Sequence, residues 1–235
     1  MISIVVPVYN EGGNIVRLME RIEEQIRTDK EIIVVYDFDE DDTVPVLNKI
    51  RDKYGFSIRL VKNSNGAGTL NAIKTGFSLA DKKTVLVVMA DLSDSLDVVD
   101  EMYRKITESG YDVVCGSRYV KGGRQIGGPF LKGFLSRMAG LSLHWISRIP
   151  THDVTNSFKM YRNSILKAMK IESTGGFEVG MEIAVKTYIA GCRITEIPYT
   201  WYDRTEGVSR FKTFQWMPKY LKWYFLCMFS KKNRE

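Results

Sequence analysis

The chain has 235 residues, of which 44% are hydrophobic, 26% are charged and 11% are aromatic, enough for one globular domain with a sizeable core. These proportions exclude a disordered chain, a collagen and a small disulfide-rich scaffold. The three cysteines are an odd number, none lies in a metal-type pair, and the chain has only two histidines. We therefore expect neither structural zinc nor a disulfide framework, and a reducing compartment.

Charge is unevenly distributed along the chain, whose net charge is +6. Residues 1–117 carry −6, residues 118–170 carry +9, residues 171–200 carry −2 and residues 201–235 carry +5. An acidic first half is followed by a basic second half in which aromatic residues are interspersed. Such a field suits an anionic partner, whether a nucleic acid, a phosphorylated small molecule or an anionic lipid, and composition alone does not choose among them.

The start of the chain, ISIVVPVY, predicts a buried strand instead of the basic stretch and apolar core of a secretion signal, so we expect no signal peptide. The longest unbroken apolar run covers residues 223–229. These seven residues are far fewer than the roughly 20 that a spanning helix needs, and we expect no transmembrane helix.

Hydrophobic periodicity predicts that strands and helices alternate in the first half of the chain. The expected strands cover residues 2–8, 31–36, 57–62, 84–90 and 112–116, and the expected helices cover 13–25, 44–53, 69–79 and 96–108. Short apolar strands joined by single amphipathic helices indicate an α/β fold with a Rossmann-like, doubly wound, mostly parallel sheet.

The second half is less regular. It predicts a glycine-rich basic loop over 118–132, helices over 130–149 and 183–190, strands near 157–161 and 194–199, and an amphipathic helix over 214–229. We divide the chain into a domain of residues 1–212 and an aromatic, basic, amphipathic helical tail of residues 213–235. Within the domain, residues 1–117 form the nucleotide-binding half and residues 118–212 the acceptor half.

Polar residues follow the expected strands at their carboxyl ends, where sheets of this kind bind ligands. They lie at residues 9–11, 37–42, 63–68 and 91–94. Asp37 directly follows its strand, where it can accept hydrogen bonds from a base or a ribose. The acids after it have an alternative role, because Asp41 or Asp42 before Thr43 makes an ordinary helix N-cap.

The loop NGAGTLNAIKTG contains Gly66 and Gly68 and opens a helix, so its backbone N–H groups can face a phosphate or a sugar. The pattern is neither a Walker A sequence nor a dinucleotide-binding fingerprint. Taken alone, it is better explained by an ordinary helix start with small residues.

Asp91 follows the very apolar segment TVLVVMA, where a carboxylate must find water, a cation or a hydrogen-bond donor. Together with Asp94, it can hold a hard divalent ion that bridges a diphosphate. The alternative for Asp94, or for Ser93, is to cap the following helix.

The other candidates are arginines and carboxylates of the second half. Arg118, Arg204 and Arg210 lie near glycines, in a pattern typical of a phosphate clamp, and the alternative is a solvated charged loop. Glu178 and Glu182 are each either catalytic or structural. No nucleophile elbow accompanies His152 and Asp153, so a hydrolase triad is not supported.

Seven segments in order resemble family 2 glycosyltransferases of the GT-A fold, in the branch of polyprenyl-phosphate (dolichol-phosphate) mannosyl and glucosyl synthases. They are VPVYNEGGNI, the acidic turn ending DDT, NGAGTLNAIKTG, MADLSD, DVVCGSRYVKGG, DVTNSFKMYR and EIPYTWYDRTEGVSRFK. The resemblance covers nearly the whole chain and implies an inverting hexosyltransferase that uses a nucleotide-sugar donor.

The resemblance also implies roles for single residues. Around the base and ribose it implies Pro7, Tyr9, Glu11 and Asp37; at the metal and diphosphate, Asp91; and near the phosphates, Arg118, Arg204, Ser209 and Arg210. The chain departs from the family's usual Asp-x-Asp, which is here Met89-Ala90-Asp91. The expected cofactor is Mg²⁺ or Mn²⁺, held by Asp91 jointly with Asp94.

Two acceptors and one non-catalytic role remain open. A polyprenyl phosphate is already an anionic nucleophile and needs cations more than a base, whereas a sugar hydroxyl of a growing glycan needs a carboxylate base such as Glu178 or Glu182. The third hypothesis is an anion- or lipid-binding module, for which Met89 is the best argument. The expected partners are a nucleotide sugar, the acceptor, and a membrane surface or a membrane-anchored subunit, not a nucleic acid. The expected location is cytoplasmic, peripheral at the cytoplasmic membrane face.

Overall fold

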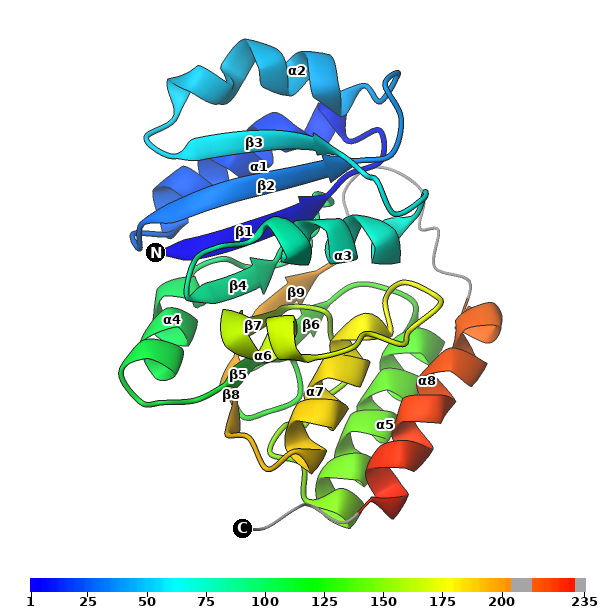
Figure 1. The fold of residues 1–235 in the computed structure, drawn as a ribbon. Coiled ribbons are helices and arrows are strands. Elements are labelled where there is room, and N and C mark those ends of the chain that lie inside the picture. Colours follow the sequence, from blue (N-terminus) through cyan, green and yellow to red (C-terminus); the bar gives the residue numbers. More distant parts are fainter. Residues whose placement is uncertain (204–212, 231–235) are drawn as a thin grey trace.

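Helices cover both faces of a seven-stranded sheet in the computed structural model, which describes residues 1–203 and 213–230 (Figure 1). The strand order is β3-β2-β1-β4-β7-β5-β8. The strands are β1 (Ile2–Pro7), β2 (Lys30–Tyr36), β3 (Ser57–Lys62), β4 (Thr84–Val87), β5 (Val113–Ser117), β7 (Lys159–Arg162) and β8 (Ile194–Pro198). A separate pair joins β6 (Arg124–Ile126) to β9 (Thr200–Tyr202).

All neighbouring strands of the large sheet run parallel except at β7, which is antiparallel to both β4 and β5. The prediction of a mostly parallel, doubly wound sheet is therefore confirmed. Because β1, β2, β3 and β4 are parallel, their carboxyl ends meet at one edge, and the loops that follow them gather there.

The helices divide between the two faces of the sheet. Those on one face are α1 (Gly12–Gln25), α2 (Thr43–Ile50, extended by a short 3-10 helix, Arg51–Lys53) and α4 (Val99–Thr107). Those on the other face are α3 (Thr69–Leu79), α5 (Phe130–Ser147), α6 (Asn163–Ala168), α7 (Val179–Ile189) and α8 (Thr213–Phe229). The strands serve both cores by alternation, since Ile4 and Val6 face the first set of helices whereas Val5 faces the second.

Several boundaries differ from the sequence-based expectation. The strand expected to run to residue 90 ends at Val87, so Asp91 lies in a turn beyond the strand. Helix α4 begins at Val99 with Val98 at its N-cap, so the idea that Ser93 or Asp94 caps it is wrong. The short helix α6 and the three-residue strands β6 and β9 were not expected, because such short elements carry too few residues for a periodic pattern.

Helix α8 belongs in part to the core. Its Trp223 and Cys227 are fully buried, and Tyr224 donates a hydrogen bond to Ser142 of α5 over 2.9 Å. The helix packs against both α5 and α7, as Figure 1 shows. One side of the segment expected to be a tail is thus a structural part of the fold. In the described residues, no helix has the length and hydropathy that crossing a membrane requires.

Helix α5 is held close to the loop of residues 148–158 by three residues spaced four apart. Ser136 hydrogen-bonds Thr155 over 2.6 Å, Gly140 lies against the backbone of His152, and the His144 ring stacks on the His152 ring at 3.9 Å between centroids. A Cβ atom on Gly140 would approach the His152 carbonyl oxygen to 2.1 Å. These three contacts therefore fix the position of α5 on the domain.

Gly140→Ala is expected to lower the free energy of unfolding by about 1–3 kcal/mol, because the new methyl group meets backbone instead of a flexible side chain. Urea denaturation measures the loss. The matched control is Gly55→Ala, whose Cβ would have no atom within 4 Å and whose φ is not positive, so it should leave stability unchanged or slightly raised. Equal effects of the two substitutions would mean that α5 does not depend on this close contact.

Candidate functional site

The first wall of the site is the turn after β1. Pro7, the last residue of β1, is buried, and Tyr9 two residues later is 42% exposed, with its ring edge-on to Phe38 at 5.2 Å. Glu11 is the N-cap of α1 and accepts a hydrogen bond from the Asn14 side chain over 2.9 Å. These residues place an accessible aromatic ring and a carboxylate at the carboxyl edge of the sheet.

A buried carboxylate that was not predicted as functional holds this turn. Asp41 is fully buried, and it accepts hydrogen bonds from the Asn10 backbone N–H over 3.1 Å and from the Thr43 backbone N–H over 2.9 Å. Asp42, not Asp41, is the N-cap of α2, and its side chain makes no capping hydrogen bond, so the capping role considered for the acidic run is not observed. The bond from Asn10 to Asp41 allows Asn10 to adopt a positive φ of 53°. Asp41 therefore acts at the start of α2 and on the turn after β1.

Asp37 binds the glycine loop in this structure. One carboxylate oxygen accepts the Asn63 side-chain N–H over 2.8 Å, and the other accepts the Gly68 backbone N–H over 2.8 Å. Gly66 and Gly68 have φ values of +88° and +112°, which favour glycine, and Gly68 is the N-cap of α3. The structure thus brings together two motifs that the sequence placed near a nucleotide, and the carboxylate keeps lone pairs for a ligand.

Asp91 and Asp94 lie in the turn after β4. Asp91 is partly exposed and accepts the Ser93 backbone N–H over 3.2 Å, whereas Asp94 is 4% exposed and accepts the Tyr199 hydroxyl over 3.1 Å. Arg21 of α1 positions the turn by donating to the Asp94 carbonyl oxygen over 2.6 Å. Of the two carboxylates, Asp91 is the more accessible to a ligand.

Burial raises the pKa of Asp94 to about 7, and the nearby Asp91 carboxylate adds to this effect. The Tyr199 hydroxyl and the more distant Arg118 and Arg21 oppose the rise without cancelling it. A raised pKa means that Asp94 is partly protonated near neutral pH. Its role as a metal ligand alongside Asp91 stays a prediction, and its position favours a hydrogen-bonded support of the turn.

Asp94→Asn is expected to remove a pH-dependent loss of stability. Because the pKa rises from 3.8 to about 7 on folding, the folded chain binds this proton more tightly than the unfolded chain does. The contribution of this group to the free energy of unfolding therefore falls as the pH rises from about 4 to 7, and it does not recover above pH 7. The variant should equal the wild type at pH 4.5 and exceed it by about 1–3 kcal/mol at pH 8 in urea denaturation with chelator. A less stable variant at pH 8 would show that the ionised carboxylate is stabilised instead.

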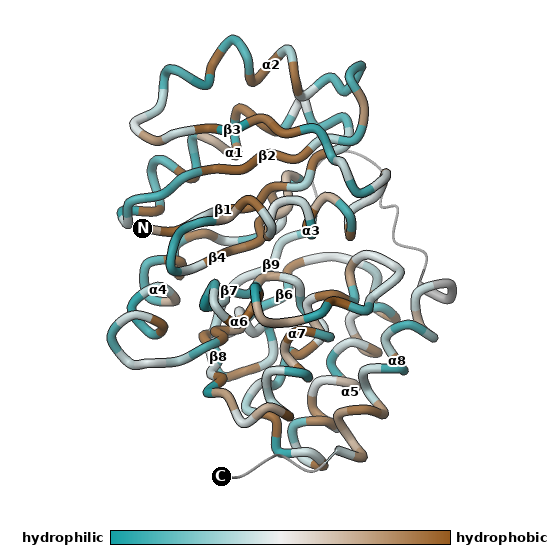
Figure 2. The backbone as a smooth tube through the Cα atoms, viewed as in Figure 1, coloured by the Kyte–Doolittle hydropathy of each residue, from teal (hydrophilic) through white to brown (hydrophobic). Residues whose placement is uncertain are grey.

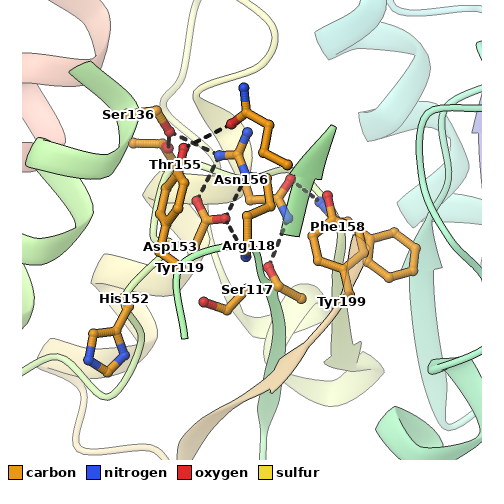
Figure 3. Close-up of polar contacts among 12 residues, drawn as sticks. Ser117, Arg118, Tyr119, Ser136, His152, Asp153, Thr155, Asn156, Phe158 and Tyr199 are labelled. Carbon is orange, nitrogen blue, oxygen red and sulfur yellow. Dashed lines mark hydrogen bonds and ion pairs between the residues drawn. The ribbon is translucent and has the colours of Figure 1, made fainter. Parts of the chain in front are cut away.

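Arg118 is the centre of a buried network, drawn in Figure 3. Its Nε and Nη2 donate to the two oxygens of Asp153 over 2.7 and 2.8 Å, and its backbone N–H donates to Asp153 over 3.0 Å. Nη2 also donates to Ser136 of α5 over 2.9 Å. Although burial opposes the charge, Asp153 holds the pKa of Arg118 above its usual range. The predicted phosphate ligand is thus held in place by an acid 35 residues away.

Glu178 and Glu182 have structural roles. Glu178 is buried and accepts the backbone N–H groups of Gly175 and Gly176 over 2.6 and 2.7 Å. Glu182 is fully buried and accepts two backbone N–H groups of the loop before α7 and the Lys186 ammonium over 2.7 Å. Burial favours its neutral form, but these bonds keep the pKa of Glu182 below its usual value. Neither carboxylate is placed as an accessible general base.

Three of the predicted site residues, Arg204, Ser209 and Arg210, lie outside the described residues. Within the described part, sequence reasoning missed Asp41, Ser136, Tyr199 and the role of Asp153. Asp153 stands in the segment DVTNSFKMYR, which carried part of the family resemblance. That segment was the available signal, because the partner of a buried arginine cannot be deduced from spacing.

Of two surface cavities, only one lies next to the carboxyl edge of the sheet. One of about 480 Å³ lies at the amino ends of the strands, where it is lined by residues that include Met1, Lys30 and Lys82. The other, of about 370 Å³, adjoins the turn of Asp91 and is lined by residues that include Arg21 and Leu92. We assign function to the carboxyl edge despite the larger volume of the first cavity, because ligands of such sheets bind there.

Comparison with known proteins identifies the family. The family described as glycosyl transferase family 2 matches residues 3–169. A dolichol-phosphate mannosyltransferase of Pyrococcus furiosus is 29% identical over 216 residues, covering 90% of this chain but 59% of that protein. A polyprenol monophosphomannose synthase of Mycolicibacterium smegmatis is 23% identical over 211 residues, covering 88% of this chain and 79% of that protein.

A solved structure agrees in fold. The mannosyltransferase PcManGT of Pyrobaculum calidifontis, in complex with GDP-Man and Mn²⁺, superposes with a TM-score of 0.66 at 16% identity, over 95% of this chain and 62% of that one. The GT-A fold expected from the sequence is thus confirmed. Since the family match covers more than half of the chain, this protein belongs to glycosyl transferase family 2.

Proposed function

We propose that the chain is an inverting glycosyltransferase that moves a hexose from a nucleotide sugar to a polyprenyl phosphate at a membrane face. The observation that carries this proposal is the match of about nine tenths of the chain to two relatives, a dolichol-phosphate mannosyltransferase and a polyprenol monophosphomannose synthase, whose names both contain a phosphorylated polyprenol. The match spans 59% of the length of the Pyrococcus relative.

The donor is proposed to bind at the carboxyl edge of the sheet. Tyr9 offers an exposed aromatic face to the base, and the Asp37 carboxylate lies beside the glycine loop, where ribose hydroxyls and phosphate oxygens would find both acceptors and backbone donors. The carboxylate of Glu11 completes this wall. Arg204, Ser209 and Arg210 are proposed to approach the diphosphate.

The residues present fit a divalent metal ion. In the described part of the chain, no group of three or more His, Cys, Asp or Glu side chains is arranged to hold one. Mg²⁺ and Mn²⁺, however, bind through one or two carboxylates when substrate phosphates supply further oxygens, and Asp91 is an accessible carboxylate in the turn after β4. We propose that Asp91 holds such an ion together with the donor, where the ion would neutralise charge on the departing diphosphate. Asp94 is proposed as the second carboxylate that holds this ion.

The acceptor chemistry requires cations and no general base. A phosphate oxygen of the polyprenyl phosphate attacks the anomeric carbon, the bond from that carbon to the donor diphosphate breaks, and the nucleoside diphosphate leaves with the electron pair. The nucleophile is already ionised, so no proton has to be removed. Arg118 is proposed to hold one of the phosphates, and the bonded positions of Glu178 and Glu182 disfavour the hydroxyl acceptor.

The test is transfer by the purified full chain. GDP-mannose and UDP-glucose are each incubated with a short-chain polyprenyl phosphate and Mn²⁺ or Mg²⁺, and the lipid-linked hexose is measured after organic extraction. A thermal-shift series of nucleotide sugars first selects the donor. Hexose transfer to polyprenyl phosphate supports the proposal. Transfer only to a glycan acceptor, or donor binding with no transfer to either acceptor, would overturn it.

A further inference from the structure

Exposed apolar side chains are concentrated on two helices that pack together. Among the described residues, sixteen large hydrophobic side chains are exposed, of which seven lie on α5 and five on α8. They are Phe130, Leu131, Phe134, Leu135, Met138, Trp145 and Ile146 on α5, and Met217, Leu221, Phe225, Leu226 and Phe229 on α8. Figure 1 shows the two helices side by side at the same end of the molecule. Such a concentration marks an interaction surface.

On α5, the apolar side chains lie opposite the side that is fixed to the domain. Phe130 is 85% exposed, Trp145 is 78% exposed, and Phe134 stacks on Phe130 at 6.3 Å between ring centroids. Helical geometry places all seven side chains within one face, away from Ser136, Gly140 and His144. Figure 2 shows hydrophobic residues on this outer helix as well as in the buried strands. Packing among residues 1–203 and 213–230 therefore does not explain the exposed face.

On α8, four of the exposed side chains recur every four residues. Met217, Leu221, Phe225 and Phe229 are 40%, 41%, 46% and 77% exposed, and they lie opposite the buried Trp223. Phe225 stacks on Phe229 at 6.2 Å between ring centroids. One side of helix α8 thus faces the core and the other side faces the solvent, as in α5.

The charge of the two helices identifies the partner. Neither helix contains an aspartate or glutamate, and the exposed basic residues Arg137, Arg148 and Lys222 lie on or next to them. A second copy of the chain would bring the same basic side chains against each other with no acid on either helix to pair them. Lys222 already pairs with Glu172 over 3.5 Å, and an anionic lipid surface accepts the apolar side chains and neutralises the two arginines.

We propose that the solvent-facing sides of α5 and α8 form one membrane-docking surface that lies on an anionic bilayer. The inference rests on the proposed function, because it names the surface that brings the protein to a lipid acceptor. Trp145 has the ring type that favours the headgroup region, and the exposed apolar side chains extend along nearly the whole of α5, from Phe130 to Ile146, so the helix lies along the surface. Ser136, on the opposite side of α5, hydrogen-bonds Arg118, so docking places this arginine about one helix diameter, roughly 10 Å, from the lipid surface.

Flotation of the full chain with vesicles tests the surface. The wild type should float with vesicles of phosphatidylcholine and phosphatidylglycerol at low salt, and less with phosphatidylcholine alone or at high salt. Phe130→Ser with Phe134→Ser on α5, and Leu221→Ser with Phe225→Ser on α8, should each weaken binding by about tenfold or more. The matched control pair is Ile126→Ser with Tyr202→Ser, whose side chains are 48% and 43% exposed on the small β6–β9 sheet.

A second pair of variants tests the charge. Arg137→Gln with Arg148→Gln should reduce binding to the anionic vesicles and reduce its dependence on salt, whereas Arg51→Gln with Arg104→Gln, exposed arginines on the 3-10 helix after α2 and on α4, should not. Thermal denaturation of every variant checks that the fold is retained. Wild-type flotation of both apolar pairs would overturn the proposal, and so would a self-associated chain that the variants dissociate without any vesicle binding.

Transfer assays in detergent separate this proposal from the proposed function. A chain that floats as predicted but transfers no hexose to polyprenyl phosphate would support the docking surface and overturn the function. A chain that transfers hexose in detergent but does not float with anionic vesicles would do the reverse.

Discussion

Asp91→Asn is expected to abolish hexosyl transfer while leaving the fold intact. The residue lies in the turn after β4, where its partly exposed side chain accepts a backbone N–H of the same turn. The amide has nearly the same shape but no negative charge, so it should not create a cavity and should bind a divalent ion poorly. The expected loss is at least about a hundredfold in kcat/KM, or about 2.7 kcal/mol of transition-state stabilisation.

The matched control is Asp97→Asn. Asp97 is an exposed acid six residues further along the chain, next to the start of α4, and its amide variant should retain activity within about twofold. Calorimetric titration of Mn²⁺ in the presence of the nucleoside diphosphate gives a readout that does not require turnover. If Asp91→Asn keeps more than about a tenth of the wild-type rate, the residue does not hold a metal and diphosphate.

The sequence was informative about the fold where strands and helices are long enough for their hydrophobic pattern to repeat. The bounds expected for β3 and α3 agree with the structure, and those of β1, β2 and α1 agree within one residue. Periodicity does not encode which strands pair, so nothing in the pattern showed that β7 inserts antiparallel between β4 and β5. The three-residue strands β6 and β9 are too short for an alternating pattern, and the six residues of α6 make fewer than two helical turns, so these elements were missed.

The topology of the sheet brings together some of the residues that the sequence assigned to one site. Asp37 and Gly68 were each assigned to a nucleotide from their loops, and the structure joins them by a hydrogen bond of 2.8 Å. The chemistry that the sequence could not show depends on burial. Burial raises the pKa of Asp94, and the Tyr199 hydroxyl that hydrogen-bonds to this carboxylate comes from 105 residues away in the chain. The same limit applies to the pairing of Arg118 with Asp153.

Breaking that pair is expected to be strongly destabilising. Asp153 is fully buried and the Arg118 side chain is 11% exposed, so either single substitution leaves a buried charge without its partner. Asp153→Asn and Arg118→Met should each lower the free energy of unfolding by about 3 kcal/mol. In the double variant no charge is left, and the asparagine can still accept the backbone N–H of residue 118. Its loss should therefore be smaller than the sum of the two, which urea denaturation measures as a coupling free energy.

The double variant also distinguishes a structural role of Arg118 from a role in hexosyl transfer. If Arg118 only supports the fold, relief of the unpaired charge should restore hexosyl transfer toward the wild-type rate. We expect instead that the double variant regains stability and remains at least about a hundredfold less active, because the guanidinium that Asp153 holds in place is itself the proposed phosphate ligand. Arg162→Met is the matched control, since Arg162 pairs with Asp112 over 2.8 Å at a site formed by β7 and the residue before β5. Its loss should affect stability without reducing transfer, and recovery of activity in the Arg118 double variant would remove Arg118 from the site.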